Sequence, residues 1–258
     1  MPCPLCDGIR QTEFARWPQF AVHECLSCGF RFVDTTATEY PRDAQFVYDE
    51  RLIGPIVSDQ PHVRRRVRDI LRFAKAPGTA LDIGCGKGEV SLLLSRKGFT
   101  CTGVDMKAHL IDELAARHPE LTWRCAMTSE LELMPERFDV ITMYHVLEHI
   151  PDPVNALRAV KRLARPGALI ALEVPNVGGL EARLRGSKWH YYKVDHINYF
   201  RPIDLNRLAA RCGLRVVACR GYQHFSYPQD VRWKDAVKGA LGRLGFRDVV
   251  SIFLRVEA

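Results

Sequence analysis

From Thr79 onward, short apolar segments alternate with segments of helical periodicity, and this alternation constrains the fold more than any other feature. The apolar segments include "TALDIG", "TCTGVD", "FDVITMY" and "GALIALEVP", and the helical ones include "GEVSLLLSRKG" and "PVNALRAVKRLA". Strands that alternate with helices predict an α/β, Rossmann-like fold, with a mostly parallel sheet and helices on both faces. Ligands of such sheets bind beyond the carboxyl ends of the strands, near the point where the strand order reverses.

Three alternate glycines follow the first predicted strand, in "ALDIGCGKGEV" at residues 80–90. A P-loop needs Ser or Thr after its lysine, whereas Lys87 is followed by Gly88. A dinucleotide site needs G-x-G-x-x-G, whereas the spacing here is G-x-G-x-G, and Glu89 at the helix start would repel a pyrophosphate. We therefore expect a ligand without phosphate groups, whose cationic or zwitterionic end lies near Asp82.

S-adenosylmethionine has this chemistry, because it combines an amino acid, a sulfonium, a ribose and an adenine. The second predicted strand ends in Asp105, whose carboxylate can accept hydrogen bonds from both ribose hydroxyls. The glycine loop and this aspartate together predict a site for S-adenosylmethionine.

The motifs "LDIGCGKG", "VD" and "FDVITMYHVLEHIPDPVNALRAVKRLARPGALIALEVPN" resemble the class I S-adenosylmethionine-dependent methyltransferase family, over residues 77–258. The resemblance implies a seven-stranded sheet whose last strand, at about 250–257, is antiparallel. It also implies a set of donor-binding residues. Around the methionine part these are Asp82, Gly84, Gly86 and Gly88, with Asp105 at the ribose and Met106 at the adenine. The family commonly has an acidic residue after its third strand, where this chain reads "CAMTSE", so we expect backbone groups and Met127 to hold the adenine.

Catalytic candidates follow the fourth predicted strand, in "MYHVLEHIPDP". Methyl transfer from a sulfonium depends mainly on positioning of the acceptor, and a base helps when the acceptor is a hydroxyl or a carbon acid. We expect Tyr144 and His145 to face the cofactor. His149, one helical turn further, is interpreted as structural.

A second cluster, "SKWHYYKVDHINYFRP" at residues 187–202, is rich in aromatic residues and histidines. Its "VDHINYF" is similar to the "EHLSYF" stretch of sugar C-methyltransferases that begin with a cysteine-ligated zinc domain. This resemblance makes His196, with Asp195 beside it, a candidate general base; the alternative is that His196 braces the loop. Those enzymes are longer and have a further C-terminal domain, so we do not infer that this chain catalyses the same reaction.

Two C-x-x-C pairs at the N-terminus predict a closed, structural zinc ribbon in residues 1–35. Its ligands would be Cys3, Cys6, Cys25 and Cys28. A redox dithiol and a set of free buried cysteines are the alternatives. This segment has three basic and four acidic residues, which favours a scaffold or substrate-docking role over nucleic-acid binding.

Residues 36–76 are predicted to form a helical connector or lid, before a methyltransferase domain at 77–258. Apolar residues recur at helical spacing from His62 to Lys75. The arginines of this helix indicate either a phosphate-binding cluster or, as we favour, a solvated face: Arg64, Arg65, Arg66 and Arg68. Three aromatic residues before this helix are candidates for a mobile flap over a cleft: Tyr40, Phe46 and Tyr48.

Charge and cysteine usage bear on location and partners. No apolar run long enough for a membrane span and no signal-peptide pattern occurs, and the nine cysteines do not form a secreted disulfide framework, so we expect a cytoplasmic protein. Residues 177–258 hold 15 Lys and Arg against 7 Asp and Glu, which suits an anionic, phosphate-bearing acceptor or marks a solvated surface.

These features favour a methyltransferase acting on a small or carrier-linked acceptor, such as a sugar, a nucleotide-sugar or a natural-product intermediate. The first alternative is an RNA base methyltransferase, against which stand the acidic ribbon and the lack of an "NPPY"-like motif after the fourth strand. The second is a non-catalytic cofactor-binding subunit. The oligomeric state is left open.

Overall fold

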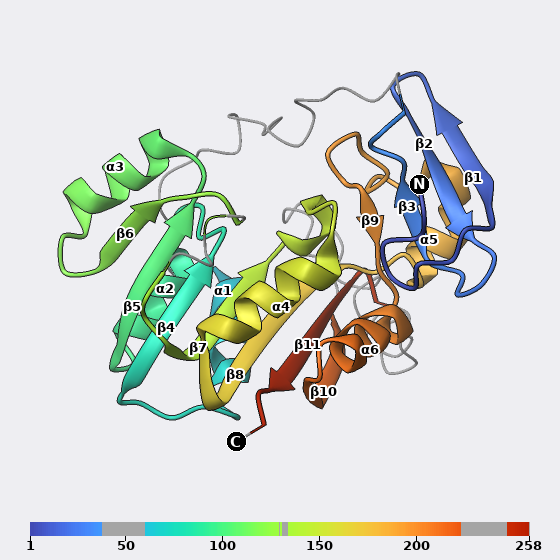
Figure 1. The fold of residues 1–258 in the computed structure, drawn as a ribbon. Coiled ribbons are helices and arrows are strands. Elements are labelled where there is room, and N and C mark those ends of the chain that lie inside the picture. Colours follow the sequence, from blue (N-terminus) through green and yellow to red (C-terminus); the bar gives the residue numbers. More distant parts are fainter. Residues whose placement is uncertain (38–59, 129, 131–133, 223–246, 258) are drawn as a thin grey trace, which may run out of the picture.

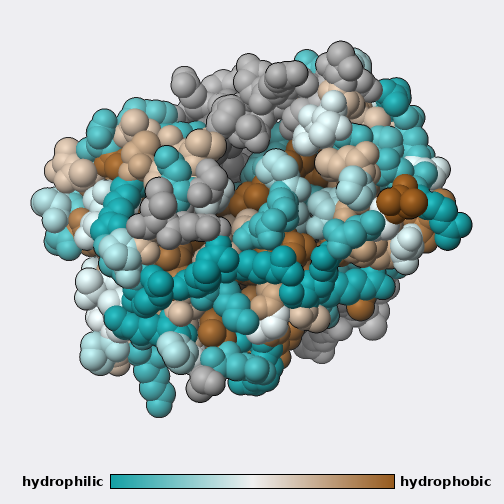
Figure 2. Space-filling model, viewed as in Figure 1, coloured by the Kyte–Doolittle hydropathy of each residue, from teal (hydrophilic) through white to brown (hydrophobic). Residues whose placement is uncertain are grey.

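The computed structural model describes residues 1–37, 60–128, 130, 134–222 and 247–257. Its strands form two sheets, a seven-stranded one and a smaller four-stranded one beside it (Figure 1). None of the helices that the structure describes is long and apolar enough to cross a membrane. On the face shown in Figure 2, hydrophilic side chains predominate and hydrophobic ones are scattered among them.

The large sheet has the strand order β10-β11-β8-β7-β4-β5-β6. Its strands are β4 (Gly78–Ile83), β5 (Phe99–Asp105), β6 (Thr122–Cys125), β7 (Phe138–Tyr144), β8 (Ala164–Pro175), β10 (Arg215–Tyr222) and β11 (Val249–Arg255). Strands β4 to β8 pair in parallel, and β11 is antiparallel to both β8 and β10. The predicted seven-stranded sheet with an antiparallel last strand is therefore confirmed.

Helices cover both faces of this sheet because alternate strand residues point to opposite sides. Ala80 packs in one apolar cluster with helices α1 (Pro61–Ile70) and α2 (Glu89–Ser95). Leu81, its neighbour in β4, packs in another with α4 (Pro153–Leu163) and α6 (Pro202–Arg211). Helix α3 (Ala108–Arg117) lies beside β5 and β6 (Figure 1).

The strand order reverses between β4 and β7, since β5 and β6 extend the sheet on one side and β8, β11 and β10 on the other. The glycine loop after β4 and the "YHVLEH" segment after β7 thus both leave the sheet at this reversal. This is where open α/β sheets bind their ligands.

The small sheet joins the N-terminal segment to a distant part of the chain. It consists of β1 (Gln11–Trp17), β2 (Phe20–Cys25), β3 (Arg31–Val33) and β9 (Asn198–Tyr199). Strand β9 pairs antiparallel with β3, placing Asn198 opposite Phe32. Because β9 begins two residues after His196, the N-terminal sheet holds the chain that leads directly to a predicted catalytic residue.

Three arginines from the basic last third contact the loops of this N-terminal segment. Arg201 and Arg207 donate to the carbonyl oxygen of Cys28 over 3.1 and 2.7 Å. Arg211 donates to the Leu5 carbonyl and pairs with the Asp7 carboxylate at 2.7 Å. Part of the basic excess therefore stabilises the contact between the two sheets and is engaged within the fold.

The predicted connector helix corresponds to α1, which ends at Ile70, five residues before Lys75. Arg64 and Arg68 are exposed, as a solvated face requires. That interpretation is wrong for Arg65 and Arg66, whose side chains are each 13% exposed and paired with Glu173 of β8. The proposed flap residues Tyr40, Phe46 and Tyr48 lie outside the described residues, and the boundaries 1–35, 36–76 and 77–258 stay predictions.

Candidate functional site

The glycine loop after β4 adopts a backbone that only glycine favours. Gly84, Gly86 and Gly88 have φ of +68°, +51° and +69°. A Cβ at Gly84 would lie 2.3 Å from Cγ2 of Val146, so this part of the loop packs against the segment after β7. A Cβ at Gly86 would meet no described atom within 4 Å. The loop is therefore braced at Gly84 and open above Gly86, as a cradle for a ligand requires.

Asp105, at the end of β5, connects to this loop. Its Oδ2 accepts a hydrogen bond of 2.9 Å from the Gly86 amide, and its Oδ1 accepts one of 3.1 Å from the Lys107 amide. Each carboxylate oxygen retains a further lone pair. This arrangement suits the predicted contact with a ribose, which stays a prediction.

Asp82 lies beneath the loop and is only 4% exposed. It accepts hydrogen bonds of 2.9 Å from Oγ of Ser91 and 2.6 Å from Oγ1 of Thr142. Burial raises the pKa of its carboxyl group above the usual value. In this structure the side chain ties β4 to α2 and β7, and its predicted contact with the methionine part of the donor stays a prediction.

Met106 and Met127 are large hydrophobic residues that the fold leaves 40% and 42% exposed. Met106 directly follows Asp105 and Met127 directly follows Ala126. The Ala126 amide donates a hydrogen bond of 3.1 Å to the Asp105 carbonyl, which holds the ends of β5 and β6 together. Exposed apolar side chains at adjacent strand ends suit an adenine ring.

Tyr144, the last residue of β7, is buried, and its hydroxyl has no hydrogen-bond partner among the described residues. The Arg66 guanidinium lies 4.5 Å from the centre of its ring. Glu89, at the start of α2, likewise has a buried carboxylate oxygen without a partner in the described chain, and burial raises the pKa of its carboxyl group. Glu89 was not among the predicted donor-binding residues, although its place beside the glycine loop makes it a candidate for contact with a cationic group of the donor.

His145 follows Tyr144 with φ of +57°, a left-handed conformation that non-glycine residues seldom adopt. Its Nδ1 lies 3.2 Å from Oε1 of Glu148, and its Nε2 lies 3.7 Å from Oε1 of Glu173. Burial alone would raise the pKa of Glu148, but the hydrogen bond from His145 and the neighbouring histidines lower it to about 2. Glu148 was not among the predicted site residues, although its place in "HVLEH" offered a signal.

His149 and His196 come together at the end of this segment. His149 belongs to a 3₁₀ turn, Leu147–His149, and its Nδ1 donates a hydrogen bond of 2.7 Å to the Asp195 carbonyl. The rings of His149 and His196 meet edge to face, with their centres 4.7 Å apart. Burial lowers the pKa of His196, which is 6% exposed, to about 3. The structure thus gathers the predicted His145, Asp195 and His196 around Glu148 and His149.

The four N-terminal cysteines form one cluster. Sγ of Cys3 lies 3.8 Å from Sγ of Cys28, and Sγ of Cys6 lies 3.6 Å from Sγ of Cys25. All four sulfur atoms lie within 4.8 Å of one another. Four thiolates around Zn²⁺, each at about 2.3 Å, would be separated by roughly 3.8 Å. The spacing therefore fits a closed tetrahedral zinc site.

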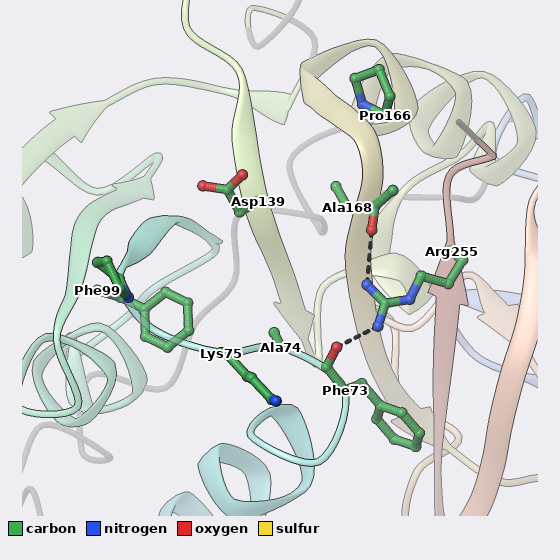
Figure 3. Close-up of a pocket in the computed structure, with 10 residues that line it drawn as sticks. Phe73, Ala74, Lys75, Phe99, Asp139, Pro166, Ala168 and Arg255 are labelled. Carbon is green, nitrogen blue, oxygen red and sulfur yellow. Dashed lines mark hydrogen bonds between the residues drawn. The ribbon is translucent and has the colours of Figure 1, made fainter.

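A hollow lies at the end of the large sheet where the parallel strands begin, opposite the end that carries the glycine loop (Figure 3). Phe99, Asp139 and Pro166, which belong to the starts of β5, β7 and β8, contribute to its lining. Arg255 bounds it and donates hydrogen bonds to the carbonyl oxygens of Gly167, over 2.8 Å, and of Phe73. Because the glycine loop follows the other ends of the strands, this hollow is separate from the candidate active site.

A family model described as a methyltransferase domain matches residues 60–219. The match contains the glycine loop, Asp105 and the histidine cluster. The chain therefore belongs to the methyltransferase-domain family, and its sheet and glycine loop make it a class I S-adenosylmethionine-dependent methyltransferase.

Similar curated proteins include ubiquinone biosynthesis O-methyltransferases. That of Coxiella burnetii (strain RSA 331 / Henzerling II) is 30% identical over 164 residues, which cover 56% of this chain and 66% of that enzyme. That of Pseudomonas aeruginosa (strain LESB58) is 35% identical over 167 residues, which cover 56% of this chain and 68% of that enzyme. The similarity to the Coxiella enzyme thus spans just under two thirds of its length.

Solved structures with the same fold include a SAM-dependent methyltransferase from Archaeoglobus fulgidus, with a TM-score of 0.58 and 19% identity. That similarity covers 75% of this chain and 93% of the other. An S-adenosylmethionine-dependent methyltransferase from Mesorhizobium loti has a TM-score of 0.57 and 15% identity, over 78% of this chain and 98% of the other. At these identities the comparison supports the fold alone.

Proposed function

We propose that this methyltransferase transfers a methyl group to the oxygen of a hydroxyl on a small or carrier-linked acceptor. The observation that carries the proposal is the cluster of the partly exposed His145 with the buried Glu148 and His196, beside the glycine loop that Val146 contacts. Polar groups that converge next to a donor site suit a polar acceptor atom. The curated relatives that are named O-methyltransferases support oxygen as that atom.

The donor side of the site is assigned to residues at the ends of β4, β5, β6 and β7. Gly86 leaves room for the donor, Asp105 would hold the ribose hydroxyls, and Met106 and Met127 would flank the adenine. Tyr144 and Glu89 each have a buried oxygen without a hydrogen-bond partner among the described residues, and we assign them to the amino-acid part of the donor. The donor supplies a methyl group on a sulfonium and leaves as S-adenosylhomocysteine.

The acceptor side is assigned to the histidine cluster. His145 is fixed by its contact with Glu148, and its left-handed backbone conformation is of a strained kind that is often found at functional sites. His196 and Asp195 come from the segment between β8 and β9 and close the same region. These residues would orient the acceptor hydroxyl toward the methyl group, and orientation is the main requirement of this displacement.

The acceptor class that we propose is a sugar, nucleotide-sugar or natural-product hydroxyl. The ribbon cysteines are proposed to bind structural zinc and so to hold β3, against which β9 pairs. Since β9 follows His196 closely, the zinc site would support the acceptor loop.

The test is to supply the purified enzyme with S-adenosylmethionine carrying a ¹³C-labelled methyl group and a small-molecule cell extract. Product carbons are then observed by NMR, because their chemical shift distinguishes a methyl group on oxygen from one on nitrogen or carbon. The proposal expects a new O-methyl signal that requires active enzyme. A new N-methyl or C-methyl signal without an O-methyl one would contradict it.

A further inference from the structure

We infer that Glu148, His149 and His196 form a binding site for a first-row divalent metal ion, separate from the cysteine cluster. One possible ligand atom from each residue lies within 4.8 Å of the other two. Two imidazoles and one carboxylate are a set that binds transition-metal ions and leaves further coordination positions open.

Two of the three residues have buried polar atoms that find no partner in the part of the chain that the structure describes. Oε2 of Glu148 and Nδ1 of His196 make no hydrogen bond within the described chain, and the residues are 1% and 6% exposed. A buried polar atom that is left unpaired destabilises the folded protein. A metal ion would satisfy both atoms.

The third residue is oriented in the manner of a metal ligand. His149 donates its Nδ1 proton to the Asp195 carbonyl over 2.7 Å, which leaves Nε2 as the nitrogen with a free lone pair. A ligating histidine almost always donates its other ring nitrogen to a carbonyl or a carboxylate in this way. Oε1 of Glu148 is held similarly by His145, at 3.2 Å.

The backbone fixes the distance between the two halves of the site. The Ile197 amide donates to the Glu148 carbonyl over 2.9 Å, and the Asn198 side chain donates to the Ile150 carbonyl over 2.6 Å. Glu148 and His149 follow β7, whereas His196 precedes β9, so these bonds hold together ligands that are 47 or more residues apart. A site held this way is formed before a metal ion binds.

The ligand types decide which ions the site accepts. Two imidazole nitrogens disfavour Mg²⁺ and Ca²⁺, which prefer oxygen, and favour Fe²⁺, Co²⁺ or Zn²⁺. With the carboxylate as third ligand the site also accepts Mn²⁺, the weakest binder of this series and the one that magnetic resonance detects. The absence of thiolates distinguishes this site from the cysteine cluster, which favours Zn²⁺.

The role of the ion rests on the proposed function. An acceptor hydroxyl bound at an open position of the ion would have a lower pKa, since a divalent ion stabilises the negative oxygen. Its proton would pass to solvent as the oxygen–carbon bond forms and the sulfur–carbon bond of the donor breaks. The metal site itself does not depend on which acceptor is used.

The test measures Mn²⁺ binding to the full chain after its cysteine site has been loaded with zinc. Binding is measured as the loss of the free Mn²⁺ signal in electron paramagnetic resonance. We expect one Mn²⁺ per chain. His149→Ala and Glu148→Gln should each weaken binding at least tenfold. His190→Ala removes a half-exposed imidazole from the nearby segment and should leave binding unchanged. Circular dichroism melting of each variant shows that the loss is not caused by unfolding.

Absence of Mn²⁺ binding to the wild-type protein would overturn the inference, as would equal binding by wild type and the folded His149→Ala variant. Methyl transfer is measured separately, with and without Mn²⁺. Tight, His149-dependent Mn²⁺ binding without any O-methyl product would uphold the metal site and contradict the proposed function. O-methyl product from a protein that binds no Mn²⁺ would do the reverse.

Discussion

Arg66 donates two hydrogen bonds, of 2.9 and 2.7 Å, to the same carboxylate oxygen of Glu173, and so fastens helix α1 to strand β8. The other oxygen accepts a bond of 2.7 Å from Arg65. Although burial opposes ionisation, the two arginines hold the pKa of Glu173 well below its usual range. The same Arg66 lies over the ring of Tyr144, so this ion pair also supports a residue of the proposed donor site.

Glu173→Gln should lower the free energy of unfolding by about 3–5 kcal/mol, because it leaves two arginines without their buried carboxylate. Urea denaturation checks this value. Glu181→Gln is the matched control, since its 2.7 Å ion pair with Arg185 lies near the surface and should contribute less than about 1 kcal/mol. Equal losses in the two variants would show that the buried pair is not the stronger of the two.

Gly86→Ala should lose S-adenosylhomocysteine binding with little further effect on folding. Its added methyl group would enter the open space above the loop, and the left-handed backbone costs roughly 1–2 kcal/mol for alanine. Gly167→Ala is a close control, because Gly167 also has a positive φ, of +77°, and no described atom within 4 Å of its Cβ position. Isothermal calorimetry should show at least tenfold weaker binding in Gly86→Ala alone. Similar affinity in both variants would remove the loop from the donor site.

Asp105→Asn should weaken S-adenosylhomocysteine binding by roughly tenfold or more, because hydrogen bonds to a charged group contribute about 1.5–3 kcal/mol. The asparagine preserves the size of the side chain and an acceptor oxygen for the Gly86 amide. Asp112→Asn, on the exposed side of α3, serves as the control for a lost charge. Calorimetry on the three proteins gives the comparison, and an unchanged affinity in Asp105→Asn would contradict the ribose assignment.

Cys28→Ser should remove tightly bound zinc from the cysteine cluster, lower the melting temperature and reduce turnover. We expect lower turnover because the cluster holds β3, and β3 pairs with β9, which begins two residues after His196. Zinc content after dialysis is measured by inductively coupled plasma mass spectrometry. Cys219→Ser changes an exposed cysteine of β10, outside the cluster and away from the proposed donor site, and should alter none of these quantities. Full zinc content in Cys28→Ser would argue against a four-cysteine site.

The large sheet was predictable because its evidence is local: strands of apolar residues alternate with amphipathic helices from Thr79 onward. The glycine loop was predictable for the same reason. Strand β9 was not, because Asn198 and Tyr199 form a strand only through pairing with Phe32 and Arg31, far away in sequence. The burial of Arg66 likewise depends on Glu173, a partner that no periodicity in the helix indicates.

The site shows the same limit. The place of His145 after a strand predicts it as a site residue, and the resemblance to sugar C-methyltransferases predicts Asp195 and His196. The structure brings the three together. His149 was interpreted as structural and Glu148 was passed over, since their shared environment arises only when the segment before β9 folds back onto the segment after β7. The hydrogen bonds that Asp82 accepts from Ser91 and Thr142 were likewise not predictable, because the sheet and α2 bring these side chains beside it, and its contact with the donor stays a prediction.

The most direct test of the central claim is transfer of a radiolabelled methyl group from S-adenosylmethionine into cell extract, separated into small-molecule and RNA fractions. The account predicts label in the small-molecule fraction, lost when Gly86→Ala replaces the wild-type enzyme. Nuclease-sensitive label in the RNA fraction alone would contradict it.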